Sequence, residues 1–173
     1  MEAKKHAAVI RLRAASINDL ELVNYWETKQ HVIDCDPDGE WNWELELNRD
    51  PEWREQWIAE LNGKPIGFLQ IIDPYLEETH YWPPVQKNKR AIDIWIGEEN
   101  NMNKGYGTKI MELAIERCFQ NPEVDGILID PLRSNTKAHR FYERLGFEFV
   151  EERKFDETAC FVYELKRKSS IRR

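Results

Sequence analysis

A loop with two glycines separates a predicted strand from a predicted helix near the middle of the chain. The strand covers residues 90–97, and the loop consists of Met102, Asn103, Lys104, Gly105, Tyr106, Gly107 and Thr108. The first N–H groups of a helix have no partners within the helix and carry the positive end of its dipole. Glycine has no side chain, so an anion can approach the main chain closely. The sequence therefore predicts that residues 102–108 bind a phosphorylated ligand.

Two common phosphate-binding motifs do not fit this loop. A P-loop requires Gly-x-x-x-x-Gly-Lys-Ser/Thr, whereas Lys104 stands before Gly105. The dinucleotide-binding fingerprint requires a third glycine at the position that Ile110 occupies here. We therefore expect neither a kinase or GTPase nor a Rossmann domain.

A single carboxylate interrupts the hydrophobic strand before the loop. Asp93 lies between Ile92 and Ile94, in a strand that we expect to be central in its sheet. A carboxylate is costly in that position unless it faces a wet cleft or a cationic partner. Asp93 is therefore a candidate functional residue, and a buried structural hydrogen-bonding role is the alternative.

The first third of the chain predicts a strand, a helix and an irregular segment. Residues 9–13 alternate as a strand does, and Ser16 precedes an apolar helical pattern. Residues 28–52 are rich in acidic side chains and lack a clear period, so we expect a loop with short helical turns. Tryptophans recur here and beyond: Trp26, Trp53 and Trp57 are expected in the core, and Trp41 and Trp43 are left undecided.

The next segment predicts a hairpin and a functional loop. Asn62 and Gly63 separate two strand-like runs, 53–61 and 66–72, and Asn-Gly favours a tight hairpin turn. The polar connection 73–89 combines aromatic residues with carboxylates, a combination that suits a cationic ligand.

Helix and strand patterns alternate after the glycine loop. Apolar residues recur at helical spacing up to Cys118, and residues 124–130 form a short apolar strand. A second helix begins near Asn135 and ends at Gly146, with Tyr142 on its apolar face. Tyr142 suits either a core aromatic or a residue of a site. Two strands, 147–153 and 159–165, complete the pattern.

Composition predicts one globular domain in the cytoplasm. A chain of 173 residues with 41% hydrophobic content can bury one core. No run approaches the roughly 20 apolar residues that cross a bilayer, and the first residues lack a secretory signal, so no membrane role is expected. The three cysteines are read as ordinary thiols, and neither they nor the four histidines have metal-site spacing, so no metal is expected.

The charge distribution argues for a cationic partner. The net charge is −7, and residues 1–165 alone carry 20 basic against 32 acidic residues. Such a body repels nucleic acid and attracts cations, although acidic surfaces also serve solubility. The division is therefore a domain at 1–165 and a basic tail at 166–173, which we expect to be a frayed end.

The element order resembles the GCN5-related N-acetyltransferase (GNAT) superfamily over nearly the whole chain. The glycine loop matches that family's pyrophosphate-binding loop from its first glycine, although Met102 replaces the usual Gln or Arg. The stretch from Asn135 through Tyr142 to Phe147 is similar to the second family signature. The resemblance implies an α/β (α+β) fold: a single domain with a central mixed, mostly antiparallel sheet flanked by helices.

The resemblance also implies roles for individual residues. Acetyl-CoA would be the co-substrate, held by residues 102–108, by Asn135 at the pantetheine arm and by main-chain N–H groups of Ile94, Trp95 and Ile96. Tyr142 would face the thioester sulfur, where its hydroxyl could protonate the leaving thiolate. Asp93 would lie near the attacking amine. Its ordinary pKa differs from that of an amine by about 6 units, so a proton relay through water is favoured over direct deprotonation.

Within the superfamily, the chain is most similar to aminoglycoside 6′-N-acetyltransferases. The expected acceptor is accordingly a polycationic small molecule, with these residues at the acceptor: Asp93, Asp130, Tyr81, Trp82, Glu78, Asp156 and, less directly, Glu77. The alternatives are an N-acyltransferase for a lysine derivative or a polyamine, and a CoA-binding module without turnover. The sequence leaves the regiochemistry and the oligomeric state open.

Overall fold

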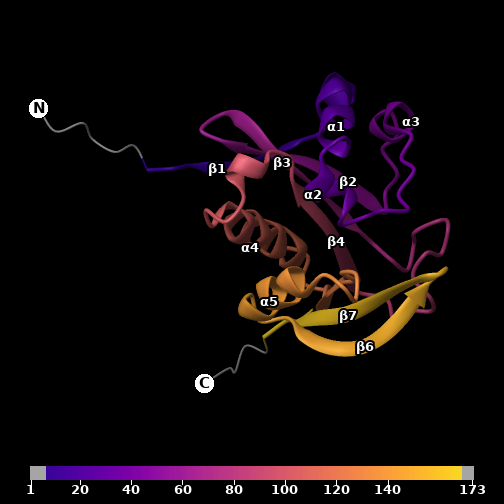
Figure 1. Cartoon of the computed structure of the whole chain (residues 1–173). Helices are drawn as coiled ribbons and strands as arrows, with labels where there is room; N and C mark the ends of the chain where they lie inside the picture. The colour runs from indigo at the N-terminus through magenta and orange to yellow at the C-terminus, as the bar shows by residue number, and fades with distance from the viewer. Residues whose placement is uncertain (1–6, 169–173) are drawn as a thin grey trace, which may run out of the picture.

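The computed structural model describes residues 7–168 and contains one seven-stranded sheet in the order β1-β2-β3-β4-β5-β7-β6 (Figure 1). The strands are β1 (Ile10–Ala14), β2 (Arg54–Leu61), β3 (Lys64–Ile72), β4 (Lys89–Ile96), β5 (Gly126–Ile129), β6 (Glu148–Phe155) and β7 (Thr158–Lys166). All neighbouring pairs are antiparallel except β4 and β5, which are parallel. The expected mixed, mostly antiparallel sheet is confirmed, with Asp93 on its central strand.

Helices cover both faces of the sheet. They are α1 (Leu20–Glu27), α2 (Gln30–Ile33), α3 (Trp43–Leu47), α4 (Tyr106–Phe119) and α5 (Thr136–Arg144), with short 3₁₀ turns η1 (Ile17–Asp19) and η2 (Glu99–Asn101). The apolar faces of α4 and α5 pack on one side of the sheet, around Ile110 and Phe147. On the other side α1 and α3 place Trp26 and Trp43 against Phe68. A third, smaller cluster gathers Trp82, Leu128 and Phe155, so the hydrophobic core of the described residues has three parts.

The β2–β3 hairpin follows the sequence prediction. Asn62 and Gly63 have φ angles of 51° and 82°, and the two strands pair in antiparallel register. Positive φ at both central residues is what a type I′ hairpin turn requires, and Asn-Gly adopts it at little cost. The predicted antiparallel pair is confirmed.

Strands β4 and β5 pair only at their beginning. The parallel register runs from Lys89 opposite Gly126 to Ala91 opposite Leu128, whereas β4 stays paired with β3 as far as Ile96. Beyond Ala91 the two central strands diverge, and one edge of β4 has no neighbouring strand within residues 7–168. We call this edge, residues 92–96, the open edge.

The main chain of β4 points alternately to β3 and to the open edge. The N–H of Gly97 donates to the Ile66 carbonyl at 2.9 Å, which places the odd-numbered groups of β4 toward β3. In an antiparallel pair the next residue points the other way. The main-chain groups of Ile94 and Ile96 therefore face the open edge.

The last strand extends past the expected domain boundary. Lys166 belongs to β7, and the Arg167 guanidinium donates to the carbonyls of Phe119, Asn121 and Val124. Within the expected tail, Lys166 thus continues the sheet and Arg167 closes the end of α4, and residues 169–173 lie outside the described residues. Within residues 7–168, none of the helices combines the length and the apolarity needed to cross a membrane.

Candidate active site

The glycine loop forms the start of α4. Asn103 and Gly105 have φ angles of 58° and 82°, and Gly105 is the N-cap residue. No side chain caps this helix, and within the described chain no backbone carbonyl accepts from the N–H groups of residues 103–108. Such unpaired, convergent N–H groups suit an anion. The loop is therefore suited to an anion, and its assignment to a pyrophosphate stays a prediction.

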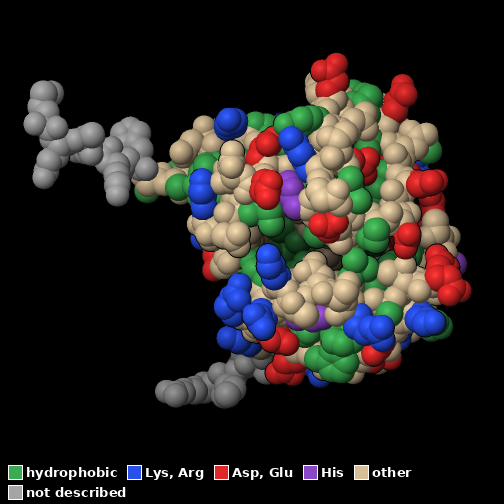
Figure 2. Space-filling view, in the orientation of Figure 1, with side chains coloured by type: hydrophobic (Ala, Val, Ile, Leu, Met, Phe, Trp, Pro, Cys, Tyr) green, Lys and Arg blue, Asp and Glu red, His purple; other side chains and the backbone are tan. Residues whose placement is uncertain are grey.

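A large cleft lies beside the open edge. Its volume is about 740 Å³, and it reaches from α5 across β4 to the segments 35–41 and 77–82. The cleft brings together these predicted site residues: Asp93, Ile94, Trp95, Asp130, Tyr142, Asn135, Tyr81, Trp82, Glu78 and Asp156. Ile96 and residues 102–108 are not part of its lining. Figure 2 shows a hollow near the position of β4, with Lys and Arg gathered below it over α5.

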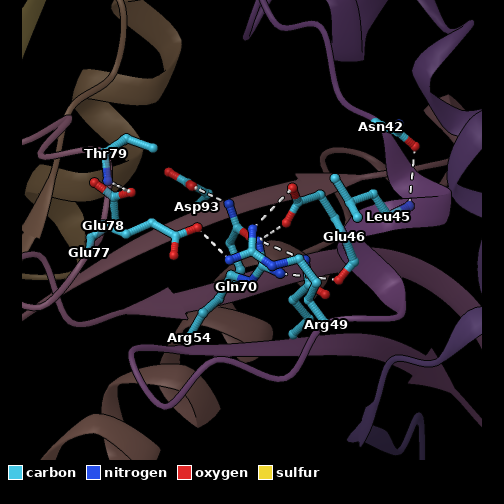
Figure 3. Close-up of polar contacts among 11 residues, drawn as sticks. Asn42, Leu45, Glu46, Arg49, Arg54, Gln70, Glu77, Glu78, Thr79 and Asp93 are labelled. Carbon is cyan, nitrogen blue, oxygen red and sulfur yellow. Dashed lines mark hydrogen bonds and ion pairs between the residues drawn. The ribbon is translucent and has the colours of Figure 1, made fainter.

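Asp93 projects into the cleft from the face opposite α4. Gln70, directly across on β3 and almost fully buried, donates its side-chain N–H to Asp93 Oδ2 at 2.7 Å (Figure 3). Burial raises the pKa of Asp93, and the hydrogen bond from Gln70 acts against that rise. Asp93 is therefore a fixed acceptor in a poorly solvated position. The sequence contained a signal for Gln70, since it is the one polar side chain between Ile66 and Ile72.

Asp130 is the second carboxylate on the cleft floor. It follows β5, and the Tyr81 hydroxyl donates to its Oδ2 at 2.8 Å. Burial raises the pKa of Asp130 most, and the negative charge of Asp93 raises it further. The hydrogen bond from Tyr81 lowers the pKa, but by less than these two effects raise it. Tyr81 also stacks on Phe155, with ring centroids 4.6 Å apart, and Trp82 packs edge-on against the same ring. Trp82 is only 5% exposed, so it supports Tyr81 more than it contacts a ligand.

Tyr142 extends from α5 toward the divergence of β4 and β5. Its ring packs near Phe141 and Phe147, and its hydroxyl has no hydrogen-bond partner among the described residues. Burial, followed by the charge of Asp93, raises the pKa of Tyr142. The phenol therefore keeps its proton and can donate a hydrogen bond into the cleft, but it is a weaker acid than an ordinary tyrosine.

Two glutamates expected at the acceptor are occupied by protein partners. The Glu77 carboxylate accepts from the N–H groups of Thr79 and Tyr81 at 2.7 and 2.9 Å. Burial works to raise the pKa of Glu77, but these two bonds outweigh it and the pKa falls below its usual value. Glu78 pairs with Arg49 (Figure 3). Glu77 thus shapes the loop that carries Tyr81. The charge of Glu78 is neutralised by Arg49, so Glu78 is not a free carboxylate for a ligand.

Both arginines that line the cleft are paired. Arg54, whose side chain is 3% exposed, donates to Glu46 Oε2 at 2.5 Å and to the Glu46 carbonyl at 3.1 Å. Arg49 pairs with Glu46 and Glu78. These pairs tie α3 to β2 and to the 77–82 loop (Figure 3). Their positive charge is therefore neutralised by partners from the protein itself.

The irregular segment 28–52 supplies the acidic side of the cleft. The family resemblance placed part of the substrate pocket in residues 30–52, but no individual residue of the segment was named as a site residue. Its short helices α2 and α3 confirm the expected helical turns. Cleft-lining carboxylates from this segment are Asp36, Asp38, Glu40 and Glu46. Asp38 accepts from the Thr158 hydroxyl at 2.8 Å, so the segment contacts the β6–β7 turn where Asp156 lies. The density of acidic residues was the available signal.

The tryptophans divide differently from the expectation. Trp26 and Trp43 are fully buried, so the core position of Trp26 is confirmed and the undecided Trp43 belongs to the core. Trp53 is only partly buried and lines the cleft with Trp41, because it precedes β2 at the cleft wall. Trp57 is partly buried under Arg117. Trp57 nevertheless packs against the main core, as expected, whereas the expectation that Trp53 is a core residue was wrong.

Comparison with known proteins identifies the family. The family model described as "Acetyltransferase (GNAT) domain" matches residues 16–155. This chain therefore belongs to the GNAT acetyltransferase family, and it is an acetyl-CoA-dependent N-acetyltransferase. Within residues 7–168, no three His, Cys, Asp or Glu side chains are grouped as metal ligands.

Curated relatives include antibiotic-modifying and lysine-modifying enzymes. Aminoglycoside N(6′)-acetyltransferase type 1 of Klebsiella pneumoniae is 29% identical over 153 residues, which cover 80% of this chain and 74% of the relative. The lysine N-acyltransferase MbtK of Mycolicibacterium paratuberculosis is 26% identical, with 82% and 66% covered.

Solved structures share the fold. The aminoglycoside acetyltransferase AAC(6′)-Ib in complex with coenzyme A has a TM-score of 0.80 and 26% identity, and the match covers 92% of this chain and 95% of that chain. The same enzyme has also been solved with coenzyme A and kanamycin, with a TM-score of 0.79 and the same identity and coverage.

Proposed function

We propose that this enzyme acetylates a primary amine of a polycationic small molecule, and that the acceptor is the 6′-amino group of an aminoglycoside. One observation carries the proposal. Ten carboxylate residues line the cleft, and the two arginines among its lining residues are both paired with glutamates. An acceptor with several ammonium groups finds complementary charge there.

The same arrangement argues against a lysine derivative as the acceptor. Such a molecule can carry a carboxylate as well as its amine, and that carboxylate would need a free cation or a cluster of donors. Arg49 and Arg54 are engaged in the pairs described above, so binding a second carboxylate would have to break one of them. A polyamine lacks that difficulty and stays within the proposed substrate class.

The donor side is assigned to the loop, the open edge and α5. The N–H groups of residues 103–108 would hold the pyrophosphate, since the Met102 N–H already donates to the Glu99 carbonyl. The main-chain groups of Ile94 and Ile96 at the open edge would meet the pantetheine arm and the acyl oxygen, whereas those of Trp95 face β3. Asn135 uses its Oδ1 to cap α5 through the Ala138 N–H at 3.1 Å, which leaves its amide N–H groups for the same arm. When bound, acetyl-CoA supplies the acetyl group as a thioester.

The acceptor side is assigned to Asp93 and Asp130, with Tyr81 on the wall. An ammonium must lose a proton before its nitrogen can attack. Each unit by which the pKa of Asp93 rises narrows the mismatch with the amine by about 1.4 kcal/mol, so burial makes Asp93 a better proton acceptor than an ordinary aspartate. Asp93 then orients the amine and receives its proton, directly or through one water molecule. Tyr142 donates a hydrogen bond from the opposite side.

The experiment is a coupled assay of thiol release from acetyl-CoA. Kanamycin, spermidine and free lysine are compared as acceptors, and the kanamycin product is located by NMR. We expect turnover with kanamycin at the 6′-amino group, slower turnover with spermidine, and none with lysine. A preference for lysine, or acetylation of kanamycin at another amine only, would contradict the proposal.

A further inference from the structure

A side chain from α2 covers the open edge at Ile96. His31 Nε2 lies 2.8 Å from the Ile96 carbonyl oxygen, 65 residues away in the sequence. Since a carbonyl oxygen only accepts hydrogen bonds, Nε2 must carry the proton. His31 is half-buried, so this bond is partly shielded from water.

The peptide between Ile96 and Gly97 is consequently held from both sides. Its N–H donates to Ile66 on β3, and its carbonyl accepts from His31 on α2. Trp26 adds a second support: its ring lies against Gly97, where a side chain of any size would overlap it, and its Nε1 donates to Glu98 at 3.3 Å. The end of β4, which leads into the glycine loop, is thereby fixed to α1 and α2.

His31 also contacts the chain segment that lies on the acceptor side of the cleft. Its own carbonyl accepts from the Cys35 thiol at 3.3 Å, and Cys35 is the first residue of the cleft-lining segment 35–41. One residue therefore contacts the strand edge assigned to acetyl-CoA through its ring, and the wall assigned to the amine through its main chain.

We propose that His31 is a positioning residue, which holds the open edge of β4 and the acceptor wall 35–41 in a fixed relation. The inference rests on the proposed function, because it concerns how the two substrates are placed relative to each other. His31 touches neither reacting atom. It orients the peptide group that follows Ile96, and it fixes the position of α2 against β4.

Two similar substitutions separate this role from simple packing. The amide nitrogen of glutamine reaches about the position of Nε2, whereas that of asparagine reaches about that of Nδ1. We expect H31N to lower kcat with kanamycin about tenfold and to raise the calorimetric Kd for CoA about fivefold, the loss of about one hydrogen bond. H31Q should stay within about twofold of the wild type in both measurements.

The control is Gln30→Ala, an exposed neighbour on α2 whose amide bonds to Asp34. It should leave both quantities unchanged. Amide hydrogen exchange in residues 30–41 and 92–96 should be faster in H31N than in H31Q, a measurement that needs no turnover. The inference would be overturned if H31N and H31Q had the same kcat and the same Kd for CoA, or if both matched the wild type. Absence of kanamycin turnover in the wild type would instead remove the proposed function, and the CoA comparison would still test His31.

Discussion

Asp93 combines an unfavourable environment with a single well-placed donor. A poorly solvated carboxylate is costly, and the protein retains one on its central strand opposite the buried Gln70. A structural role would be served by full pairing with the protein. Asp93 instead shares a water-accessible cleft with Asp130, so both carboxylates keep acceptor capacity for a ligand.

Replacing Asp93 by Asn tests this residue directly. The amide neither attracts an ammonium nor accepts its proton, so we expect kcat/KM for kanamycin to fall by about 100-fold or more. Initial rates of thiol release over a series of kanamycin concentrations measure the change. Glu123→Gln is the matched control, since that carboxylate is exposed and lies outside the cleft. Full turnover of D93N across the pH range would refute the role.

Tyr142→Phe removes a hydroxyl that has no protein partner within residues 7–168. The substitution therefore breaks no hydrogen bond of the protein, and the melting temperature should stay within a few degrees. We expect kcat to fall about tenfold or more at nearly constant KM, because the lost donor acts on the reacting groups. Tyr163→Phe, on β7, removes a hydroxyl that bonds Glu143 at 3.3 Å and serves for comparison. Wild-type kcat in Y142F would assign Tyr142 to the core.

For single residues, the sequence identified those that interrupt the apolar pattern of a strand or a helix. Asp93 stood out in an apolar strand, and the glycines stood out before a helix. Glu77 and Glu78 could not be separated from free carboxylates, because their partners, the Thr79 N–H and Arg49, are set by loop geometry. His31 carried no signal either, since its partner is a main-chain carbonyl 65 residues away.

The separation of β4 from β5 creates the candidate active site. Parallel pairing ends at Ala91, so Ile94 and Ile96 keep main-chain groups facing a gap in the middle of the sheet. The strand patterns in the sequence predicted both strands but not where they separate. Register depends on the packing of α4 and α5 around the gap, which no local period encodes.

The two glycines of the loop should respond differently to alanine. Gly105 has φ of 82°, so an added Cβ strains the backbone by about 1 kcal/mol and should lower the melting temperature. Gly107 lies in the first turn of α4, and its Cβ would be 3.6 Å from Phe141, an ordinary contact. G107A should fold normally and still weaken CoA binding, because the methyl group crowds the main-chain N–H groups that we expect to hold the phosphates. Calorimetry with CoA tests this, and unchanged affinity in G107A would place the pyrophosphate elsewhere.

Over the whole molecule, basic and acidic side chains are segregated between the two substrate sites. Exposed Lys137, Arg140 and Arg144 lie along α5 beside the donor side, whereas carboxylates dominate the cleft. The net charge of −7 hides this division, and the sequence predicted only the preference for a cationic partner. Which acidic residues gather around the acceptor follows from the placement of 35–41 against the β6–β7 turn, a contact between segments 120 residues apart.

Crowded carboxylates should cost the empty protein stability, and Asp130→Asn measures that cost. The folded state raises the pKa of Asp130, so it binds a proton there more tightly than the unfolded chain does. Below the ordinary aspartate pKa of about 3.9 both states are protonated and no cost exists. As pH rises toward the folded pKa, ionisation favours the unfolded chain. Asn resembles the protonated form and still accepts from Tyr81. D130N should therefore be more stable at pH 8 by at least about 1.4 kcal/mol, the equivalent of one pKa unit, and equal to the wild type near pH 3.5.

Urea unfolding at a series of pH values gives this comparison, with Asp50→Asn at an exposed position as the control. A constant difference from pH 3.5 to 8 would mean that packing, and not charge, separates the two proteins. A destabilised D130N at pH 8 would mean that the ionised carboxylate is favoured by a partner in the folded protein. The expected result couples stability to function: the negative charge that destabilises the empty cleft is the charge that an incoming polyammonium neutralises, so kanamycin should raise the melting temperature of the wild type more than that of D130N.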